Sequence, residues 1–357
     1  MSLINPPIGQ SMAIAQLEVA ITQNRLASAY LFTGFDGIGR KLAAQWLSHQ
    51  LFQDTSHPDM LWIEPTFTKD GQQYTYSEAE QHGLTAKSRS QIRIEQIRQI
   101  TTLLQQSPLL ASRSLIVIDG AETMTEAAAN ALLKVLEEPG RATLILIAPT
   151  SNHLLPTIRS RCQTIRFKRL TDELVTQVVQ KLCPELIEHP DVIRFAQGSP
   201  GRAIAAWKNA QQIPTAVIHA LNWSDRPIWD CLSLSQQIHA LDFSLQLWLL
   251  NFLQFQSWQQ SHCSRIFHQF EQARTYLSQN SQAQLVWVCL LTSLPKTQWQ
   301  LPAVICSPCQ PPSSQLPSLL ESEVATELVD VVQQPTAEPP TGLGGRQTDL
   351  FEAIALN

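Results

Sequence analysis

The sequence predicts an α/β fold in which a parallel sheet forms the core, followed by two helical regions and a disordered C-terminal tail. Residues 115–118 form a short apolar run rich in β-branched residues, which is typical of a strand buried on both faces of a parallel sheet. A glycine-rich turn at residues 34–41 lies upstream of it. Beyond residue 170 the apolar residues follow helical spacing, and from residue 301 prolines and polar residues dominate.

The composition describes a protein with a sizeable core and no strong charge preference. With 357 residues the chain has room for two or three domains. Its net charge of −5 provides no basic tract that holds duplex DNA unaided, so any such contact needs a local patch or partner subunits. The cysteines begin at Cys162 and lack framework spacing, and no signal peptide or membrane span is present, so we expect a cytoplasmic protein. A single CxxC pair, Cys306 and Cys309, predicts no metal site.

An acidic residue and a helix follow the predicted strand at residues 115–118. Asp119 stands at the carboxyl end of this strand, where ligands bind in open α/β sheets, so its carboxylate is a candidate magnesium ligand. Thr125 is placed to cap the next helix, whose apolar residues repeat at helical spacing until Pro139. The segment therefore predicts a strand, an acidic turn and an amphipathic helix.

Residues 130–139, NALLKVLEEP, resemble almost letter for letter the Walker B region of AAA+ clamp-loader subunits. In active ATPases of that family a glutamate follows the Walker B aspartate, whereas this chain has Gly120. That glutamate polarises the attacking water, and glycine has no group that accepts the proton. The resemblance implies a clamp-loader fold, and the substitution argues against hydrolysis.

The turn at residues 34–41, GFDGIGRK, keeps the glycine spacing of a phosphate-binding loop at Gly34, Gly37 and Gly39. Arg40 stands at the lysine position and Lys41 at the position of the magnesium-binding hydroxyl. An arginine can still contact a phosphate, but an ammonium group repels magnesium. Weak binding without turnover and no binding at all both remain open, and we favour a vestigial loop. The resemblance implies that partner subunits bind ATP and magnesium, and that this chain needs no cofactor.

The remaining core elements can be placed in order. We expect strands at residues 30–33, 59–63, 143–148 and 164–167, and helices near residues 10–25, 42–51 and 92–104. Residues 66–91 are polar and aperiodic, which predicts an exposed loop insertion. Many relatives carry a four-cysteine zinc module before this insertion, but no cysteine precedes Cys162 here, so the module is absent or has lost its metal.

Two arginines lie in motifs of the same family. Ser160-Arg161-Cys162 matches the SRC motif, whose arginine enters the nucleotide site of the neighbouring subunit and stabilises charge on the transferring phosphoryl group. The alternative is a simple surface arginine. Residues 198–202, GSPGR, look like the sensor 2 element, in which an arginine faces the nucleotide. With an altered phosphate loop, Arg202 can instead have a structural role.

The end of the sequence contains a short apolar motif. Residues 347–351, QTDLF, resemble the peptide by which proteins bind sliding clamps; the corresponding residues are Gln347, Asp349, Leu350 and Phe351. Adjacent apolar side chains in a polar tail have no core to enter, which favours a clamp-binding site over a random apolar end.

The resemblance and the composition together predict five segments: a degenerate AAA+ core at 1–168, a helical lid at 169–208, a helical collar at 209–300, a disordered linker at 301–345 and a clamp-binding tail at 346–357. It implies a clamp-loader subunit of DNA polymerase III that does not hydrolyse ATP and supplies Arg161 in trans. The implied partners are the motor (gamma/tau) and delta subunits, the sliding clamp and, through the complex, primed DNA. An active motor ATPase and a non-replicative AAA+ adaptor are the alternatives.

Overall fold

The computed structural model describes residues 5–53, 57–69, 72–74, 90–222, 228–279 and 281–294. The chain divides into one compact unit of Met1–Ile187 with Ala196–Arg202, and a second of Glu188–Phe195 with Ala203–Asn357. The predicted linker and clamp-binding tail, including Gln347, Asp349, Leu350 and Phe351, lie outside the described residues. No helix among the described residues is long and apolar enough to cross a membrane.

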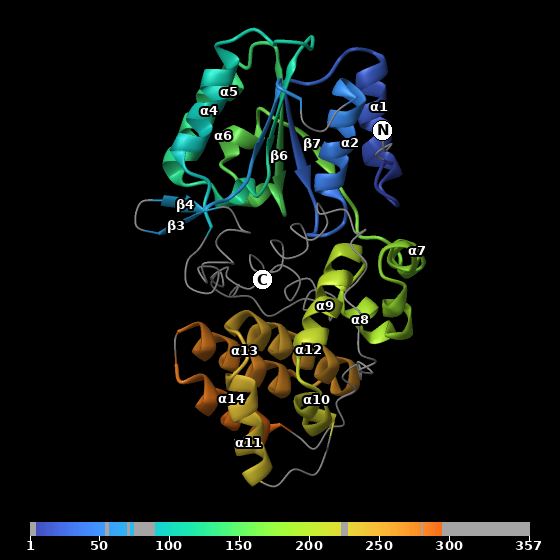
Figure 1. Ribbon diagram of the computed structural model, residues 1–357, viewed down its shortest axis with the longest axis vertical. Coiled ribbons are helices and arrows are strands. Elements are labelled where there is room, and N and C mark those ends of the chain that lie inside the picture. Colours follow the sequence, from blue (N-terminus) through green and yellow to red (C-terminus); the bar gives the residue numbers. More distant parts are fainter. Residues whose placement is uncertain are drawn as a thin grey trace. The chain divides into compact units, whose positions relative to one another are not determined.

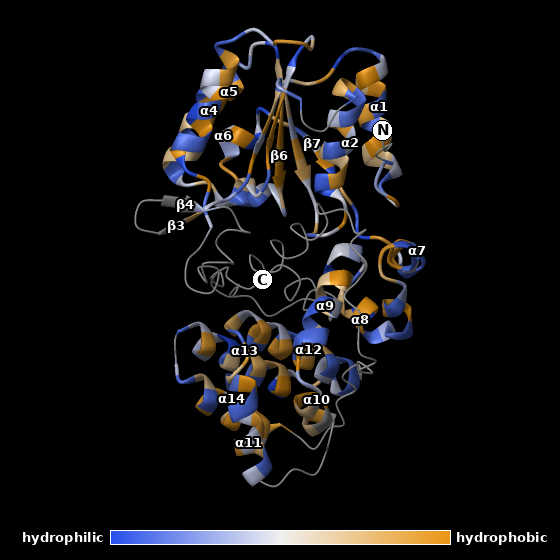
Figure 2. Ribbon diagram, in the orientation of Figure 1, coloured by the Kyte–Doolittle hydropathy of each residue, from blue (hydrophilic) through white to orange (hydrophobic). Residues whose placement is uncertain are grey.

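A five-stranded parallel sheet forms the centre of the first unit (Figure 1). Its strand order is β2-β5-β6-β1-β7, so strands distant in sequence lie side by side. The strands are β1 (Ala29–Thr33), β2 (Met60–Ile63), β5 (Ser114–Ile118), β6 (Ala142–Ala148) and β7 (Gln163–Arg166). Every residue of β1, β5 and β6 is buried, as the continuous apolar runs predict for a sheet covered on both faces (Figure 2). The predicted α/β fold with a parallel sheet is confirmed.

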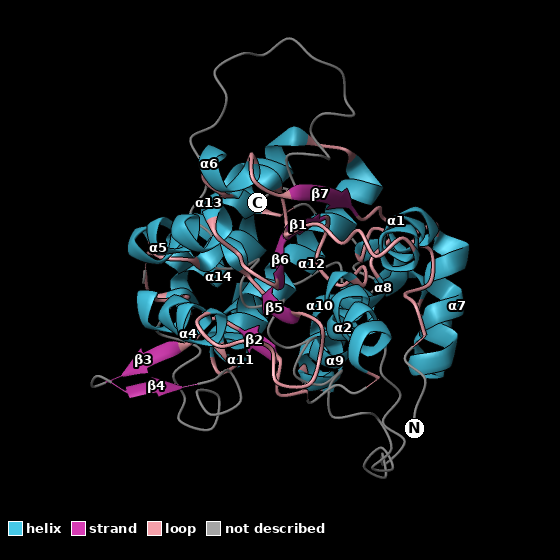
Figure 3. Cartoon of the chain, turned by 90° about the horizontal axis from the view of Figure 1, so that it is seen from above, coloured by secondary structure: helices cyan, strands magenta, loops and turns pink. Residues whose placement is uncertain are grey.

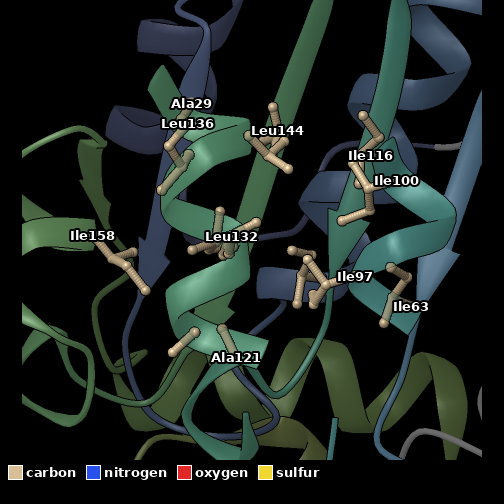
Figure 4. Packing of buried hydrophobic residues seen from close by; sticks show 14 of the residues in the cluster. Ala29, Ile63, Ile97, Ile100, Ile116, Ala121, Leu132, Leu136, Leu144 and Ile158 are labelled. Carbon is tan, nitrogen blue, oxygen red and sulfur yellow. The ribbon is translucent and has the colours of Figure 1, made fainter. Parts of the chain in front are cut away.

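Helices cover both faces of this sheet (Figures 1 and 3). On one face lie α1 (Ser11–Thr22) and α2 (Arg40–Phe52), and on the other α4 (Ile94–Leu104), α5 (Glu126–Glu137) and α6 (Pro156–Arg159). Buried side chains of α4, α5 and α6 pack against the strands in one hydrophobic cluster, which includes Leu132 of α5 and Leu144 of β6 (Figure 4). This packing fixes the ends of the strands and helices that carry the polar residues described below.

The amino end of α5 is capped as the sequence predicts. Thr125 Oγ1 accepts a hydrogen bond from the backbone N–H of Ala128 at 3.3 Å, which satisfies one of the unpaired donors of the first turn. Pro139 and Gly140, the latter with a φ of +58°, follow the helix end. The Walker B-like segment thus folds as a strand, a short turn and a capped helix.

The expectation of an irregular loop at residues 66–91 is wrong at its beginning. Strands β3 (Phe67–Lys69) and β4 (Gln72–Tyr74) pair in an antiparallel hairpin, and Phe67 is only 1% exposed. The sequence Asp70-Gly71 between the strands is a dipeptide favoured at tight hairpins, so a local signal for this hairpin is present. Residues 75–89 lie outside the described part of the chain.

The rest of the described chain is helical. After β7 come α7 (Asp172–Leu182), α8 (Pro190–Phe195), α9 (Pro200–Gln212), α10 (Thr215–Asn222), α11 (Ile228–His239), α12 (Phe243–Ser261), α13 (Ser264–Ser278) and α14 (Ala283–Ser293); the 3-10 turns are Ala121–Thr123, Ser151–His153 and Pro184–Glu188. In the second unit Trp248 and Trp287 are fully buried, and Trp287 Nε1 donates to Gln246 Oε1 at 3.1 Å. Core packing therefore accounts for these two tryptophans.

Candidate functional site

Two carboxylates lie side by side at the carboxyl edge of the sheet. Strands β2 and β5 pair in parallel with Ile63 opposite Ile118, and the N–H of Asp119 donates to the carbonyl oxygen of Ile63 at 2.9 Å. Each strand is followed directly by an acidic residue, Glu64 after β2 and Asp119 after β5. Asp119 is predicted from the sequence and Glu64 is not, although both show the same signal, an acidic residue directly after a strand.

The side chain of Lys41, in the first turn of α2, lies against both carboxylates. Its Nζ is 2.9 Å from Glu64 Oε1 and 3.3 Å from Asp119 Oδ2. Burial raises the pKa of Asp119 above its usual range, and the positive charges of Lys41 and Arg40 limit that rise. The carboxylate predicted as a magnesium ligand is therefore paired with an ammonium group of the same chain.

Arg40, at the lysine position of the loop, also contacts a carboxylate of its own chain. Its Nη2 donates to Oδ1 of Asp36, four residues earlier, and the Arg40 side chain is buried. Asp36 was not singled out from the sequence, because any residue type can occupy that position of the motif. Both cations at the end of the loop, Arg40 and Lys41, thus have acidic partners in the same chain.

The loop itself has the backbone that its glycines allow. Gly34, Gly37 and Gly39 have φ values of +151°, +71° and +101°, a region that other residues rarely adopt. The start of α9 packs directly on this loop. Gly201 N–H donates to the carbonyl oxygen of Gly37 at 3.0 Å, and Ser199 Oγ donates to that of Asp36 at 2.6 Å. We call these four residues, Asp36, Gly37, Ser199 and Gly201, the loop–helix contact.

Arg202 lies immediately after this contact. Its backbone N–H donates to Ser199 Oγ at 3.2 Å, so the structure brings the backbone of the sensor 2-like residue to the phosphate loop. Ser199 accepts this bond with the same hydroxyl that donates to the loop. The GSPGR segment is connected to the loop through the Ser199 hydroxyl and the Gly201 N–H.

Two further side chains hold the loop in place. The guanidinium carbon of Arg169 lies 3.5 Å from the centre of the Phe35 ring. Gln10 Nε2 donates to the carbonyl oxygens of Ile38 at 3.2 Å and Lys168 at 2.8 Å, and its Oε1 accepts from Lys168 N–H at 3.1 Å. Because Gln10 is buried, these bonds fix the loop to the segment after β7.

Gly120, the residue after Asp119, lies in a tight turn. Its φ is +67°, and a Cβ atom added there would come within 2.9 Å of Pro65 Cγ. Thr123 Oγ1 donates to the carbonyl oxygen of Gly120 at 2.7 Å and closes the turn. A larger side chain at this position would be strained by both the backbone and Pro65.

Arg161 lies on the surface beyond α6. Its Nη2 donates to Glu137 Oε1 at 2.8 Å and its Nη1 to the Thr157 carbonyl oxygen at 3.1 Å, while 37% of the side chain stays exposed. Both partners belong to α5 and α6. The adjacent Cys162 packs against the hydrophobic cluster, and burial raises its pKa to about 11, so its thiol is neutral at pH 7.

The described residues contain no group of three or more histidine, cysteine or acidic side chains placed to hold a metal ion. At the sheet edge, two carboxylates share one ammonium group instead. At this edge of the sheet, the described side chains therefore form ion pairs within the chain.

Comparison with known proteins identifies the family. Residues 9–171 match the family described as DNA polymerase III, delta subunit, and residues 173–294 match the cyanobacterial DNA polymerase III delta prime C-terminal domain. The DNA polymerase III subunit delta' of Pseudomonas aeruginosa is 35% identical over 38% of this chain and 42% of its own length, and that of Bacillus subtilis is 31% identical over 45% and 49%. Subunit tau of Bacillus subtilis is 28% identical over 49% and 31%.

These three matches each cover less than half of the relative's own length. The two family matches, in contrast, follow one another along this chain and together extend from residue 9 to residue 294. On this basis the chain belongs to the delta-prime family of DNA polymerase III subunits.

Proposed function

We propose that this chain is a clamp-loader subunit that does not hydrolyse ATP itself and that supplies Arg161 to the ATPase site of a neighbouring subunit. Membership of the delta-prime family supports the clamp-loader assignment. The observation that carries the proposal is the pairing of both loop cations with acidic residues of the same chain, Arg40 with Asp36 and Lys41 with Glu64 and Asp119.

This pairing opposes binding of magnesium-ATP at the loop. A magnesium ion requires oxygen ligands, and beside Asp119 it would meet the positive charge of Lys41. A triphosphate would also have to separate Arg40 from Asp36 to gain its charge. Both rearrangements would make the binding free energy of magnesium-ATP less favourable. A loop with the usual Lys and Ser or Thr does not have this cost.

The surroundings of Arg161 support a role outside its own chain. A guanidinium group has five N–H donors, of which the structure assigns one to Glu137 and one to Thr157. Among the described residues the other three donors have no assigned acceptor, and 37% of the side chain is exposed. An arginine supplied in trans stabilises negative charge on the transferring phosphoryl group, and its planar fork matches two phosphate oxygens.

The first test uses the purified chain. We expect no steady-state ATP hydrolysis and weak or no binding of magnesium-ATP in a titration. Steady turnover that disappears in the Arg40→Ala variant would contradict the proposal and favour the active motor subunit.

The second test uses the complete clamp loader assembled with an Arg161→Ala chain. Arginine residues supplied in trans are worth about 10³ to 10⁵ in rate, so the one site that depends on Arg161 should become almost inactive while the other sites continue. Arg159→Ala is the matched control, because Arg159 is also exposed and also donates to a residue of its own chain, Asn152, but lies outside the SRC motif. Unchanged DNA-stimulated hydrolysis in the Arg161→Ala complex would remove the assignment.

The motif at residues 347–351 adds a clamp-binding role to this proposal. Leu350 and Phe351 are adjacent apolar residues that can enter a preformed pocket together, and Gln347 can fix the orientation by amide hydrogen bonds. We propose that this segment tethers the chain to the sliding clamp, with Asp349 as the acidic middle residue of the motif.

A further inference from the structure

The guanidinium group of Arg161 is held by two acceptors of its own chain. One is the Glu137 carboxylate and the other is the Thr157 carbonyl oxygen, at 2.8 and 3.1 Å. They engage different nitrogens, Nη2 and Nη1, so rotation of the guanidinium plane is restricted. A single acceptor would leave the plane free to turn about that bond.

Both acceptors are fixed by the same hydrophobic cluster (Figure 4). Glu137 is the last residue of α5, directly after Leu136, which is 6% exposed and belongs to the cluster. Thr157 lies in α6 directly before Ile158, which is completely buried. The backbone segments that carry the two acceptors therefore have little freedom to move relative to one another, although the charged pair itself is at the surface.

We infer that Glu137 is a positioning residue for Arg161: it orients the guanidinium group so that the remaining N–H donors face a phosphate of the neighbouring subunit. This inference rests on the proposed function of Arg161. A long, flexible side chain loses rotamer freedom when it becomes ordered in the transition state. When Glu137 orders the side chain beforehand, that loss does not add to the barrier for hydrolysis.

Glu137 affects the rate of ATP hydrolysis through its hydrogen bond and through its charge, and the two effects are opposite. The hydrogen bond orients Arg161, whereas the negative charge weakens the attraction between Arg161 and a phosphate. Glu137→Gln keeps an acceptor and removes the charge, so the variant should retain at least half of the normal rate. Glu137→Ala removes both and should lose rate.

Glu138 provides a matched control. It is the neighbouring residue, it has the same side chain and it is exposed. Within the described part of the chain no hydrogen bond or ion pair is assigned to its side chain, whereas Glu137 contacts Arg161. Glu138→Ala therefore reports the effect of losing one negative charge near α5 without loss of the contact.

The test is DNA-stimulated ATP hydrolysis by the complete clamp loader assembled with each variant. Because other sites in the complex also hydrolyse ATP, the rate of the Arg161→Ala complex is subtracted as background. The free energy of an exposed ion pair corresponds to about a 1.4- to 5-fold change in a rate or equilibrium constant. Glu137→Ala should therefore lower the Arg161-dependent kcat about two- to fivefold, with KM for ATP unchanged. Glu138→Ala should leave it unchanged.

A double variant separates positioning from a general structural effect. If Glu137 acts through Arg161, then Glu137→Ala added to Arg161→Ala causes no further loss of rate. An equal loss in both backgrounds would overturn the inference in favour of damage to α5. So would equal rates for Glu137→Ala and Glu138→Ala, or a rate increase in Glu137→Ala, which would make Glu137 an inhibitory partner.

The same measurements distinguish this inference from the proposed function. If Arg161→Ala leaves the rate unchanged, the role of Arg161 in trans is wrong, and the role of Glu137 falls with it. If Arg161→Ala lowers the rate but Glu137→Ala matches Glu138→Ala, only the positioning role of Glu137 is wrong.

Discussion

Gly201 and Gly37 touch through their backbones. The N–H of Gly201 donates to the carbonyl oxygen of Gly37 at 3.0 Å, and a Cβ atom added to Gly201 would come within 2.6 Å of the Gly37 Cα. A Cβ atom added to Gly37 would come within 2.8 Å of the Gly201 Cα. The approach of α9 to the loop therefore requires glycine on both sides.

The first prediction concerns Gly201→Ala. In a helix free of other contacts this change stabilises by about 1 kcal/mol, but the clash with Gly37 should instead destabilise by about 1 to 3 kcal/mol. Urea unfolding measures the difference. Gly140→Ala is the control: φ there is +58° with open space around the position, so only the backbone cost of about 1 to 2 kcal/mol applies. A more stable Gly201→Ala chain would show that the loop and α9 separate readily.

The second prediction concerns the charge of Lys41. Burial raises the pKa of Asp119, and Lys41 opposes that rise, so Lys41→Met should raise this pKa further. When the folded-state pKa of Asp119 is raised above its usual value of 3.8, the ionised carboxylate is less stable in the folded state than in the unfolded state. The free energy of unfolding is therefore reduced at pH values above 3.8. At pH 7 we expect Lys41→Met to lower the free energy of unfolding by about 1 to 3 kcal/mol. The loss is limited because Glu64 is about half exposed and solvent screens its charge.

The pH dependence identifies the cause of that loss. As the pH falls through the raised pKa, Asp119 takes up a proton and the charge penalty disappears, so Lys41→Met should approach the parent chain. Urea unfolding at pH 7 and pH 5 measures this. Lys134→Met, at an exposed position of α5, serves as the control and should change stability little at either pH. A deficit that grows on acidification would contradict the assignment to Asp119.

The third prediction concerns Asp59, at the opposite edge of the sheet. Burial alone would raise its pKa, but hydrogen bonds from the N–H groups of Leu109, Leu110 and Ala111 at 2.6, 2.9 and 2.8 Å, together with His57, lower it below 3.8. A lowered carboxylate pKa contributes stability above pH 3.8, and this contribution is lost as the pH falls.

Asp59→Asn should therefore lower the free energy of unfolding by about 2 to 4 kcal/mol at pH 7, because the amide accepts fewer of these hydrogen bonds than the carboxylate does. The difference from the parent chain should shrink as the pH falls below about 3.8 and through the lowered folded-state pKa of Asp59. Thermal unfolding across this range is the measurement, with the exposed Asp172→Asn as control. A difference independent of pH would assign the loss to packing rather than to ionisation.

The fourth prediction concerns the clamp-binding motif. Burial of Leu350 and Phe351 is worth about 3 to 6 kcal/mol before ordering costs, so a peptide of residues 345–357 should bind the cognate clamp weakly. The Leu350→Ala/Phe351→Ala peptide should show no binding in the same titration. Equal binding by the two peptides, or none by either, would reject the tether.

The sequence was sufficient for the parts of the site that depend on local pattern. Asp119 was placed at the carboxyl edge of its strand because a buried strand directly precedes it, and Thr125 was identified as a cap from its position before the helix. The glycine spacing at residues 34–41 indicated a glycine-rich turn between a strand and a helix, and the structure has such a turn between β1 and α2.

The partners of these residues could not be predicted, because they depend on strand order and on helix packing. Glu64 meets Lys41 only because β2 lies next to β5, and Ser199 meets Asp36 across 163 residues of sequence. Glu137 was noted only as part of a family motif, and its contact with Arg161 depends on how α5 packs against α6.

The ammonium group of Lys41 has one property that a metal ion lacks: it is covalently part of the chain. A bound magnesium ion exchanges with solvent and departs with its nucleotide, whereas the Lys41 charge stays between Glu64 and Asp119 at all times. The electrostatic balance at this edge is therefore the same whatever the surrounding concentrations of chelator, magnesium or ADP. If the chain acts as proposed, a neighbouring ATPase subunit would meet an edge whose charge does not depend on the nucleotide state.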